Sequence, residues 1–308
     1  MIQRSDGLVG GLYALAAFTA WGVLPIYFHE MRFVPPVQLL SHRFVWAMLL
    51  LAILITVIGR WGNILAALRD RRTLLMLVGS TLFISANWLT FIWAVGQERV
   101  TEVSLGYYIN PLVNVVLGML VLRERLNAMQ AVAVGLAVLG VANLAVQTAG
   151  LPWPSLAVAL TFGFYGLIRK TTALGSIEGL FLETALATPF AFAYLVYVEQ
   201  AGTAVFGHVN GGADIALVAA GLVTALPLIW FASAARRLTY IAVGFFQYIA
   251  PTGHFFLALF VFHEPFSWPH MVTFLCIWAG LAVFSVDRWR QSNRARRDPA
   301  AIKPVAGS

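Results

Sequence analysis

The chain is poor in charged residues and has a single cysteine. Of its 308 residues, 20 are Lys or Arg and 13 are Asp or Glu, so that 11% are charged, against about 25% in soluble domains. This deficit disfavours a water-soluble globular protein. The lone Cys276 excludes a disulfide framework or a multi-cysteine metal site within the chain.

Motifs of the common enzyme classes are missing as well. The His-Glu pairs at 29–30 and 263–264 lack the second His of a metalloprotease helix, because Phe33 and Ser267 occupy that position. The sequence has no Walker A loop, no G-x-S-x-G elbow and no G-x-G-x-x-G after a strand. We therefore expect no enzyme activity, no cofactor, no metal and no ATP-driven pumping by this chain alone.

Long apolar runs dominate instead. Apolar residues make up 60% of the chain, and about ten runs are each long enough to cross a hydrocarbon core of about 30 Å as a helix. The pattern predicts an all-α, polytopic membrane protein with ten transmembrane helices. We place them at 8–28, 38–58, 73–94, 103–122, 128–147, 153–170, 177–198, 214–235, 242–262 and 268–286.

Positive charge is unevenly distributed between the loops that join these spans. Arg32 and Arg99 lie on one side, Arg43 lies inside a span, and the other Lys and Arg residues, Arg169 and Lys170 among them, fall on the opposite side. Lys and Arg are retained in the cytoplasm, so both termini are predicted to be cytoplasmic. The net charge of +7 is then a topology signal plus a basic tail near anionic lipid, and not a nucleic-acid-binding surface.

Two segments of the chain, 99–141 and 237–281, are similar to each other. The matching positions are Arg99, Thr101 and Gly106 with Arg237, Thr239 and Gly244, followed by Ile109, Pro111, Glu124 and Gly140 with Ile249, Pro251, Glu264 and Gly280. Since each copy would hold five helices, an odd number, the second copy must lie inverted in the membrane. We predict repeats at 1–150 and 151–287 and a basic cytoplasmic tail at 288–308; inverted repeats are typical of secondary transporters.

Polar side chains recur along single faces of the predicted helices 73–94, 103–122 and 242–262. Amide groups in hydrocarbon must face protein or a water-filled cavity, so these faces either line a substrate site or hold helices together. Pro111 and Pro251 are predicted hinges, with plain kinks as the alternative. The candidate substrate-binding residues on these helices are Asn87, Trp88, Tyr107, Asn110, Asn114, Gln247, Tyr248 and His254.

Two ionisable residues, Arg43 and Glu183, lie deep inside predicted spans at equivalent positions of the two copies. An intramembrane charge suggests function by default, so both join the candidate site. Arg43 would attract or gate an anionic part of the substrate, and Glu183 would bind an amine or carry a coupling proton. The alternatives are a snorkelling Arg43 and a Glu183 satisfied by hydroxyl groups. Because they lie near opposite mouths, we predict no salt bridge between them.

Several stretches resemble the RarD branch of the EamA-like drug/metabolite transporters. They are residues 41–43 (SHR), 87–95 (NWLTFIWAV), 106–112 (GYYINPL), 122–126 (LRERL), 247–252 (QYIAPT) and 262–266 (FHEPF). The resemblance implies a ten-helix inner-membrane permease with its substrate held between two inverted repeats. Members of the branch are commonly labelled chloramphenicol-sensitivity proteins, and relatives move metabolites by proton coupling or exchange.

We therefore expect a bacterial inner-membrane permease that works by alternating access. Its partners would be the lipid bilayer and a small solute, such as a metabolite, an amino acid-like compound or a drug such as chloramphenicol. The alternative is a non-transporting membrane sensor or assembly partner. Gly7-x3-Gly11 is a small-x3-small pattern that packs helices within or between chains, which leaves a homodimer open.

Overall fold

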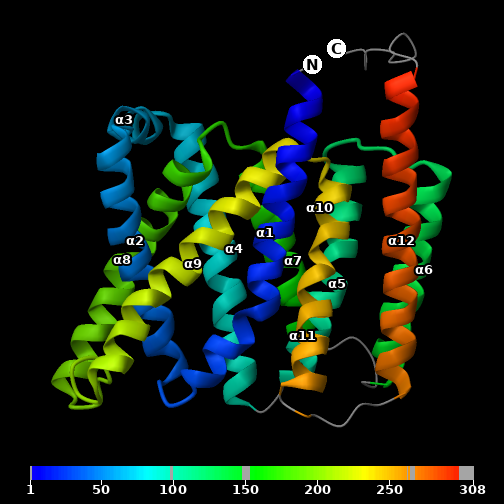
Figure 1. Ribbon diagram of the computed structural model, residues 1–308. Helices are drawn as coiled ribbons and strands as arrows, with labels where there is room; N and C mark the ends of the chain where they lie inside the picture. The colour runs from blue at the N-terminus through cyan, green and yellow to red at the C-terminus, as the bar shows by residue number, and fades with distance from the viewer. Residues whose placement is uncertain (1, 98–99, 148–152, 262, 264–267, 298–308) are drawn as a thin grey trace.

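The computed structural model describes residues 2–97, 100–147, 153–261, 263 and 268–297, and across these residues the chain is helical with no strand (Figure 1). The helices are α1 (Ile2–Glu30), α2 (Pro36–Ile58), α3 (Trp61–Arg69), α4 (Arg71–Gly96), α5 (Val100–Leu120), α6 (Ala128–Gln147), α7 (Trp153–Thr171), α8 (Ser176–Gln200), α9 (Gly211–Arg237), α10 (Tyr240–Gln247), α11 (Ile249–Phe260) and α12 (Trp268–Arg297).

The predicted all-α, polytopic membrane fold is confirmed. Each predicted span coincides with one helix, or with the pair α10 and α11. Within the described residues, 8 helical stretches are long and apolar enough to cross a membrane; α5 has a shorter apolar part, Ser104–Leu120, and α7 is not among the 8. The number of ten crossings therefore stays a prediction.

Three local features differ from the expected boundaries. Helix α3 was not predicted, because its 9 residues are too short for a span; it lies across one end of the molecule with Ile64 and Ala67 buried (Figure 1). Helix α12 continues to Arg297, so that residues 288–297 of the expected tail are helical. Residues 298–308 and the repeat positions Arg99 and Glu264 lie outside the described residues.

The corresponding prolines of the internal repeat, Pro111 and Pro251, have different effects on the backbone. The predicted helix 242–262 is in fact two helices that meet at Tyr248. Proline lacks an N–H, and its ring clashes with the carbonyl four residues earlier, which here belongs to Gln247. Helix α5 instead runs unbroken through Pro111. The helix is therefore interrupted at Tyr248, and the hinge role of both prolines stays a prediction.

The ends of the helices separate the basic residues as the loop pattern predicted. The start of α1, the end of α12 and helix α3 all lie at one end of the bundle, which also holds Arg60, Arg69 and Arg236 (Figure 1). Arg32 follows the other end of α1. The basic end is the one we predict to face the cytoplasm, because positive residues are retained there.

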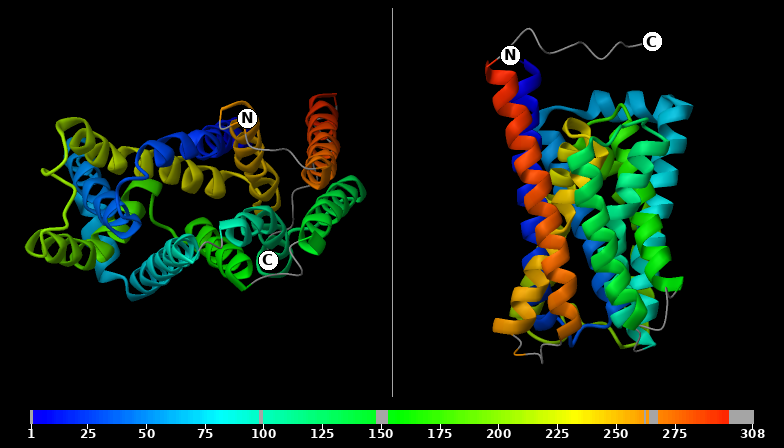
Figure 2. Two further views of the ribbon diagram at one scale, coloured as in Figure 1. Left: turned by 90° about the horizontal axis from the view of Figure 1, so that it is seen from below. Right: turned by 90° about the vertical axis from the view of Figure 1, so that its right-hand side faces the viewer.

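Helices α6 and α12 pack side by side through a pair of reciprocal contacts (Figure 2). A Cβ atom on Gly140 would lie 3.0 Å from the carbonyl oxygen of Thr273, and one on Gly280 would lie 2.8 Å from that of Ala133. Thr273 Oγ1 also donates to the Gly140 carbonyl at 3.1 Å. Small residues thus let the two backbones approach closely, at positions that correspond in the predicted repeats.

The N-terminus of α10 is capped by a side chain from the other predicted repeat. The backbone N–H groups of Tyr240 and Ile241 donate to Glu124 Oε1 at 2.6 Å and Oε2 at 2.9 Å. The first backbone N–H groups of a helix have no partner within the helix, and a carboxylate there also interacts favourably with the helix dipole. Glu124 therefore ties the loop after α5 to the start of α10.

The substitution Glu124→Gln is expected to lower the free energy of unfolding by about 1–2 kcal/mol, since it removes a charge-assisted helix cap. The measurement is thermal melting of the purified protein in detergent. Glu30→Gln is the matched control, because Glu30 is exposed at the end of α1. Equal melting temperatures for the two variants would contradict the capping role.

Candidate functional site

The predicted binding residues separate into a cationic group, an amide group and a carboxylate group. The cationic group surrounds Arg43 on α2. Its guanidinium lies 4.4 Å from the ring centroid of Trp88 and 5.5 Å from that of Phe28. Its Nε donates to Thr224 Oγ1 at 2.8 Å. Because these partners come from α4, α1 and α9, Arg43 points into the bundle and does not snorkel towards lipid.

The amide group joins α5 to α10 in the middle of the bundle. Gln247 donates through Nε2 to Asn110 Oδ1 and accepts through Oε1 from Asn114 Nδ2 at 2.6 Å. Asn110 Nδ2 donates in turn to the carbonyl of Ala159 on α7 at 2.8 Å. Asn114 Oδ1 is buried and has no hydrogen-bond partner among the described residues. The three amides thus bind mainly to one another and to the backbone.

Three other predicted residues make contacts that hold helices together. Asn87 donates to the Val158 carbonyl at 2.8 Å, which joins α4 to α7. Tyr248 donates to the Tyr108 carbonyl at 3.4 Å and packs against α6 and α12, away from Gln247. His254 Nε2 lies 3.0 Å from the carbonyl oxygen of Trp21 on α1. These contacts satisfy polar groups of all three side chains, and their role in substrate binding stays a prediction.

The carboxylate group surrounds Glu183 on α8, which is only 2% exposed. Its Oε1 accepts from Ser80 Oγ at 2.5 Å and its Oε2 accepts from the Tyr165 hydroxyl at 3.4 Å. Arg169 Nε lies 3.6 Å from Oε1. Glu183 therefore forms an ion pair with Arg169, and Arg43 has a separate set of partners.

Arg169 is the functional candidate that the sequence reasoning missed. We expected it in a cytoplasmic loop, whereas the structure places it in the last turn of α7 with 1% of its surface exposed. Its Nη2 donates to the Gly175 and Ser176 carbonyls at 3.3 and 3.1 Å, while Nε and Nη1 are buried and make no hydrogen bond within the part of the chain that the structure describes. The expectation was wrong because the α7–α8 connection folds back over the guanidinium.

A glycine on α8 makes room for this arginine. A Cβ atom on Gly179 would overlap the guanidinium of Arg169, so a side chain at this position would require the guanidinium to move. Gly179 precedes Glu183 by four residues, one helical turn, and both therefore face α7. This glycine, one turn before a buried glutamate, is the signal in the sequence that could have identified the pair.

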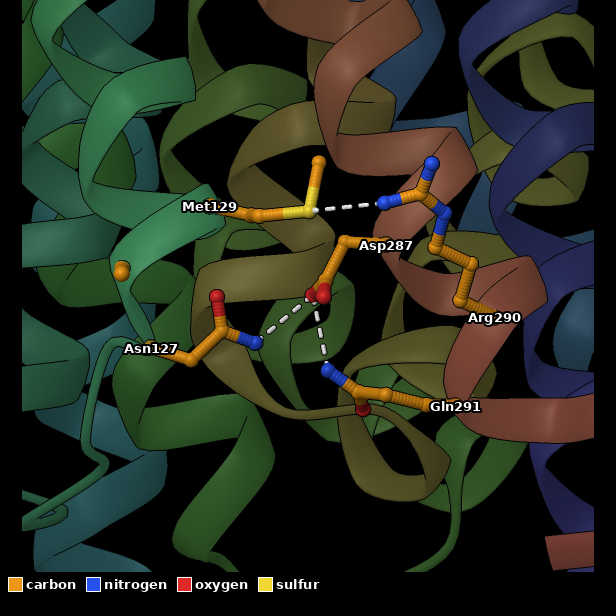
Figure 3. Close-up of a pocket in the computed structure, with 6 residues that line it drawn as sticks. Asn127, Met129, Asp287, Arg290 and Gln291 are labelled. Carbon is orange, nitrogen blue, oxygen red and sulfur yellow. Dashed lines mark hydrogen bonds between the residues drawn. The ribbon is translucent and has the colours of Figure 1, made fainter. Parts of the chain in front are cut away.

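Two surface hollows lie away from these groups. One, of about 280 Å³, lies between the start of α6 and the end of α12, where Asp287 accepts from Asn127 and Gln291 and Arg290 contacts Met129 (Figure 3). The other, of about 340 Å³, is apolar and lies between α3 and α8. Neither hollow is lined by a predicted site residue.

Comparison with known proteins supplies the family. The model of the EamA-like transporter family matches residues 8–146. A transporter of Vibrio cholerae whose function is uncharacterised is 42% identical over 96% of this chain and 98% of its own. The protein RarD of Escherichia coli K12 is 41% identical over 90% of this chain and 94% of its own. The chain belongs to the RarD branch of the EamA-like family.

Membership of this branch establishes a membrane transporter of the drug/metabolite type, with a small-molecule substrate and a lipid environment. It is a multi-pass membrane protein. A solved structure, titled only as the crystal structure of a protein, has a TM-score of 0.68 at 20% identity and covers 91% of this chain and 96% of its own. That likeness concerns the fold of this EamA-like chain and not its substrate.

Proposed function

We propose that this transporter moves a small solute by alternating access between two inverted repeats, 1–150 and 151–287, and that Glu183 carries the coupling proton. The protein would lie in the bacterial inner membrane with both termini in the cytoplasm, since the basic loops, the start of α1 and the end of α12 share one side.

The packing of the helices supports the two-repeat proposal. Helix α1 packs against α9 and α11, just as α7, its counterpart in the second repeat, packs against α4 and α5. Three other counterpart pairs meet each other directly: α2 with α8, α5 with α10 and α6 with α12. Such pseudo-symmetric contacts allow one half to rock against the other around a central site.

The buried Glu183–Arg169 pair is the observation that carries the coupling proposal. Through Ser80, Tyr165 and Arg169, the carboxylate holds α8 to α4 and α7. A proton on Glu183 removes the negative charge that Arg169 faces, and so weakens the attraction between α7 and α8. A single protonation can then favour one packing of these helices over another, which is what coupling requires.

The first experiment identifies the substrate by measuring equilibrium binding of candidate solutes. Thermal melting of the purified protein would be measured with amino acids, phenicols such as chloramphenicol, nucleobases, sugar phosphates and nucleotide sugars. A ligand of the folded state raises stability by about 2.7 kcal/mol at a hundredfold excess over its Kd. A compound that raises the melting temperature then becomes the solute for flux measurements.

The coupling test measures flux of that solute in vesicles with and without an imposed pH gradient. Glu183→Gln is expected to abolish accumulation driven by the gradient while exchange of labelled for unlabelled solute continues, because the variant can still change conformation but binds no proton. Glu199→Gln is the control, since Glu199 lies on the same helix and is largely exposed. Gradient-driven accumulation by Glu183→Gln would overturn the proposal.

A further inference from the structure

Arg43 is a cation inside the bundle that has no carboxylate partner among the described residues. We propose that Arg43, Trp88 and Tyr107 together recognise the carboxylate of a monoanionic solute that has a planar, apolar body. This inference deepens the proposed transport function by naming the class of substrate. The transport of that solute rests on the proposed function, whereas its binding to Arg43 does not.

The guanidinium of Arg43 has hydrogen-bonding capacity to spare. Its Nε donates to Thr224 Oγ1, and the terminal Nη1 and Nη2 groups make no hydrogen bond to the described residues. These two groups form the edge of a planar fork that binds carboxylate through two parallel hydrogen bonds. Aromatic rings of Trp88 and Phe28 contact the guanidinium, and cation–π attraction offsets only part of the cost of removing the charge from water.

Two further side chains near Arg43 carry hydrogen-bond donors. Neither the indole N–H of Trp88 nor the hydroxyl of Tyr107 makes a hydrogen bond to the described part of the chain, and both side chains are only partly buried. The Trp88 ring contacts the guanidinium, and Tyr107 lies within electrostatic range of it. The site is therefore rich in donors and poor in acceptors, which is the complement of a carboxylate.

The surroundings limit the ligand to one negative charge and an apolar body. Arg43 supplies the positive charge among Arg43, Trp88 and Tyr107. A doubly charged phosphate would therefore keep one negative charge uncompensated. The Tyr107 ring packs 6.5 Å from that of Phe91, and the Trp88 ring packs 5.1 Å from that of Phe44. Aromatic walls next to a bidentate cation favour a flat apolar group joined to the carboxylate.

Tyr27, which also interacts electrostatically with Arg43, is already engaged. Its hydroxyl donates to the Ala216 carbonyl at 3.0 Å. The amides of Asn110 and Gln247 are bonded to each other. Among these described residues, the free hydrogen-bonding capacity therefore belongs to Arg43, Trp88 and Tyr107.

The test uses three probes with one ring and different charges: benzoate, neutral benzamide and cationic benzylamine. Their affinities for the purified full-length protein in detergent would be measured by calorimetry and by thermal melting. Benzoate is expected to bind at least about tenfold more tightly than benzamide, as a charge-assisted pair predicts. Benzylamine is expected not to bind.

Variants locate the probe. Arg43→Gln should abolish the preference for benzoate over benzamide, while Arg43→Lys should reduce it, because lysine keeps the charge and loses the fork. Trp88→Phe should weaken benzoate a few-fold by removing the N–H and keeping a ring. Arg32→Gln, an exposed cation near the same end, should change nothing. If Arg43→Gln does not fold, the other two site variants still test the prediction.

Three results would overturn the inference: equal affinity for benzoate and benzamide, no benzoate binding up to about 10 mM, or an unchanged preference in the Arg43 variants. Its failure is separable from that of the proposed function. Glu183→Gln should keep the benzoate preference while losing gradient-driven flux. Coupled transport of a neutral solute without benzoate binding would overturn the inference alone.

Discussion

The substitution Arg169→Met is expected to lower the free energy of unfolding by about 3–5 kcal/mol. It leaves Glu183, which is 2% exposed, as a buried carboxylate without its cation, and stranding one member of a buried pair costs this much. Methionine keeps a comparable length of apolar side chain, so the loss reflects the charge more than a cavity. Melting temperature and yield of monodisperse protein in detergent would measure it.

The double variant Arg169→Met/Glu183→Gln is expected to regain most of that loss, because no unpaired charge remains buried. Arg71→Met is the matched control, since Arg71 is exposed at the start of α4. If the double variant is no more stable than Arg169→Met, the arginine acts through its bonds to the Gly175 and Ser176 carbonyls and not through Glu183.

The second large effect is expected at Gln247, whose substitution by methionine should cost about 2 kcal/mol. It removes a donor from Asn110 Oδ1 and an acceptor from Asn114 Nδ2, both buried. Each stranded group costs about 1 kcal/mol, at the low end of the range for buried polar groups, because membrane helices find other partners when they separate.

The control for this prediction is Gln200→Met at the exposed end of α8, which should leave the melting temperature unchanged. The outcome separates the two interpretations of the amide stripe. A destabilised Gln247→Met that keeps its ligand affinity would assign the amides to packing. Unchanged stability with lost affinity would assign them to the substrate and contradict the expected result.

Much of the fold could be predicted from the sequence, because a membrane helix depends on the residues of one continuous segment. Backbone groups in hydrocarbon must bond within the segment, so a long uncharged run is sufficient to predict a helix. The short helix α3 escaped prediction because it lies across the end of the bundle instead of spanning it. The separation of α10 from α11 had a local cause in Pro251, although only the structure located it at Tyr248.

The candidate site was less predictable. A polar residue within a membrane helix indicates that its side chain needs a hydrogen-bond partner, but it does not indicate which residue supplies that partner. Asn87 and Asn114 looked alike in the sequence, yet one bonds to a backbone carbonyl and the other to a side chain of the second predicted repeat. Arg169 looked like a loop cation and is among the largest fully buried side chains of the described residues.

The sequence alone determined the helical membrane fold, the family and the depth of Arg43 and Glu183 along their helices, because each depends on composition and spacing within one segment. Only the tertiary structure decided that Glu183 is neutralised by Arg169 while Arg43 is left with aromatic rings and a hydroxyl. Those pairings join residues of different helices, and their geometry depends on how the helices pack. No single position in the sequence therefore shows which partner its side chain has.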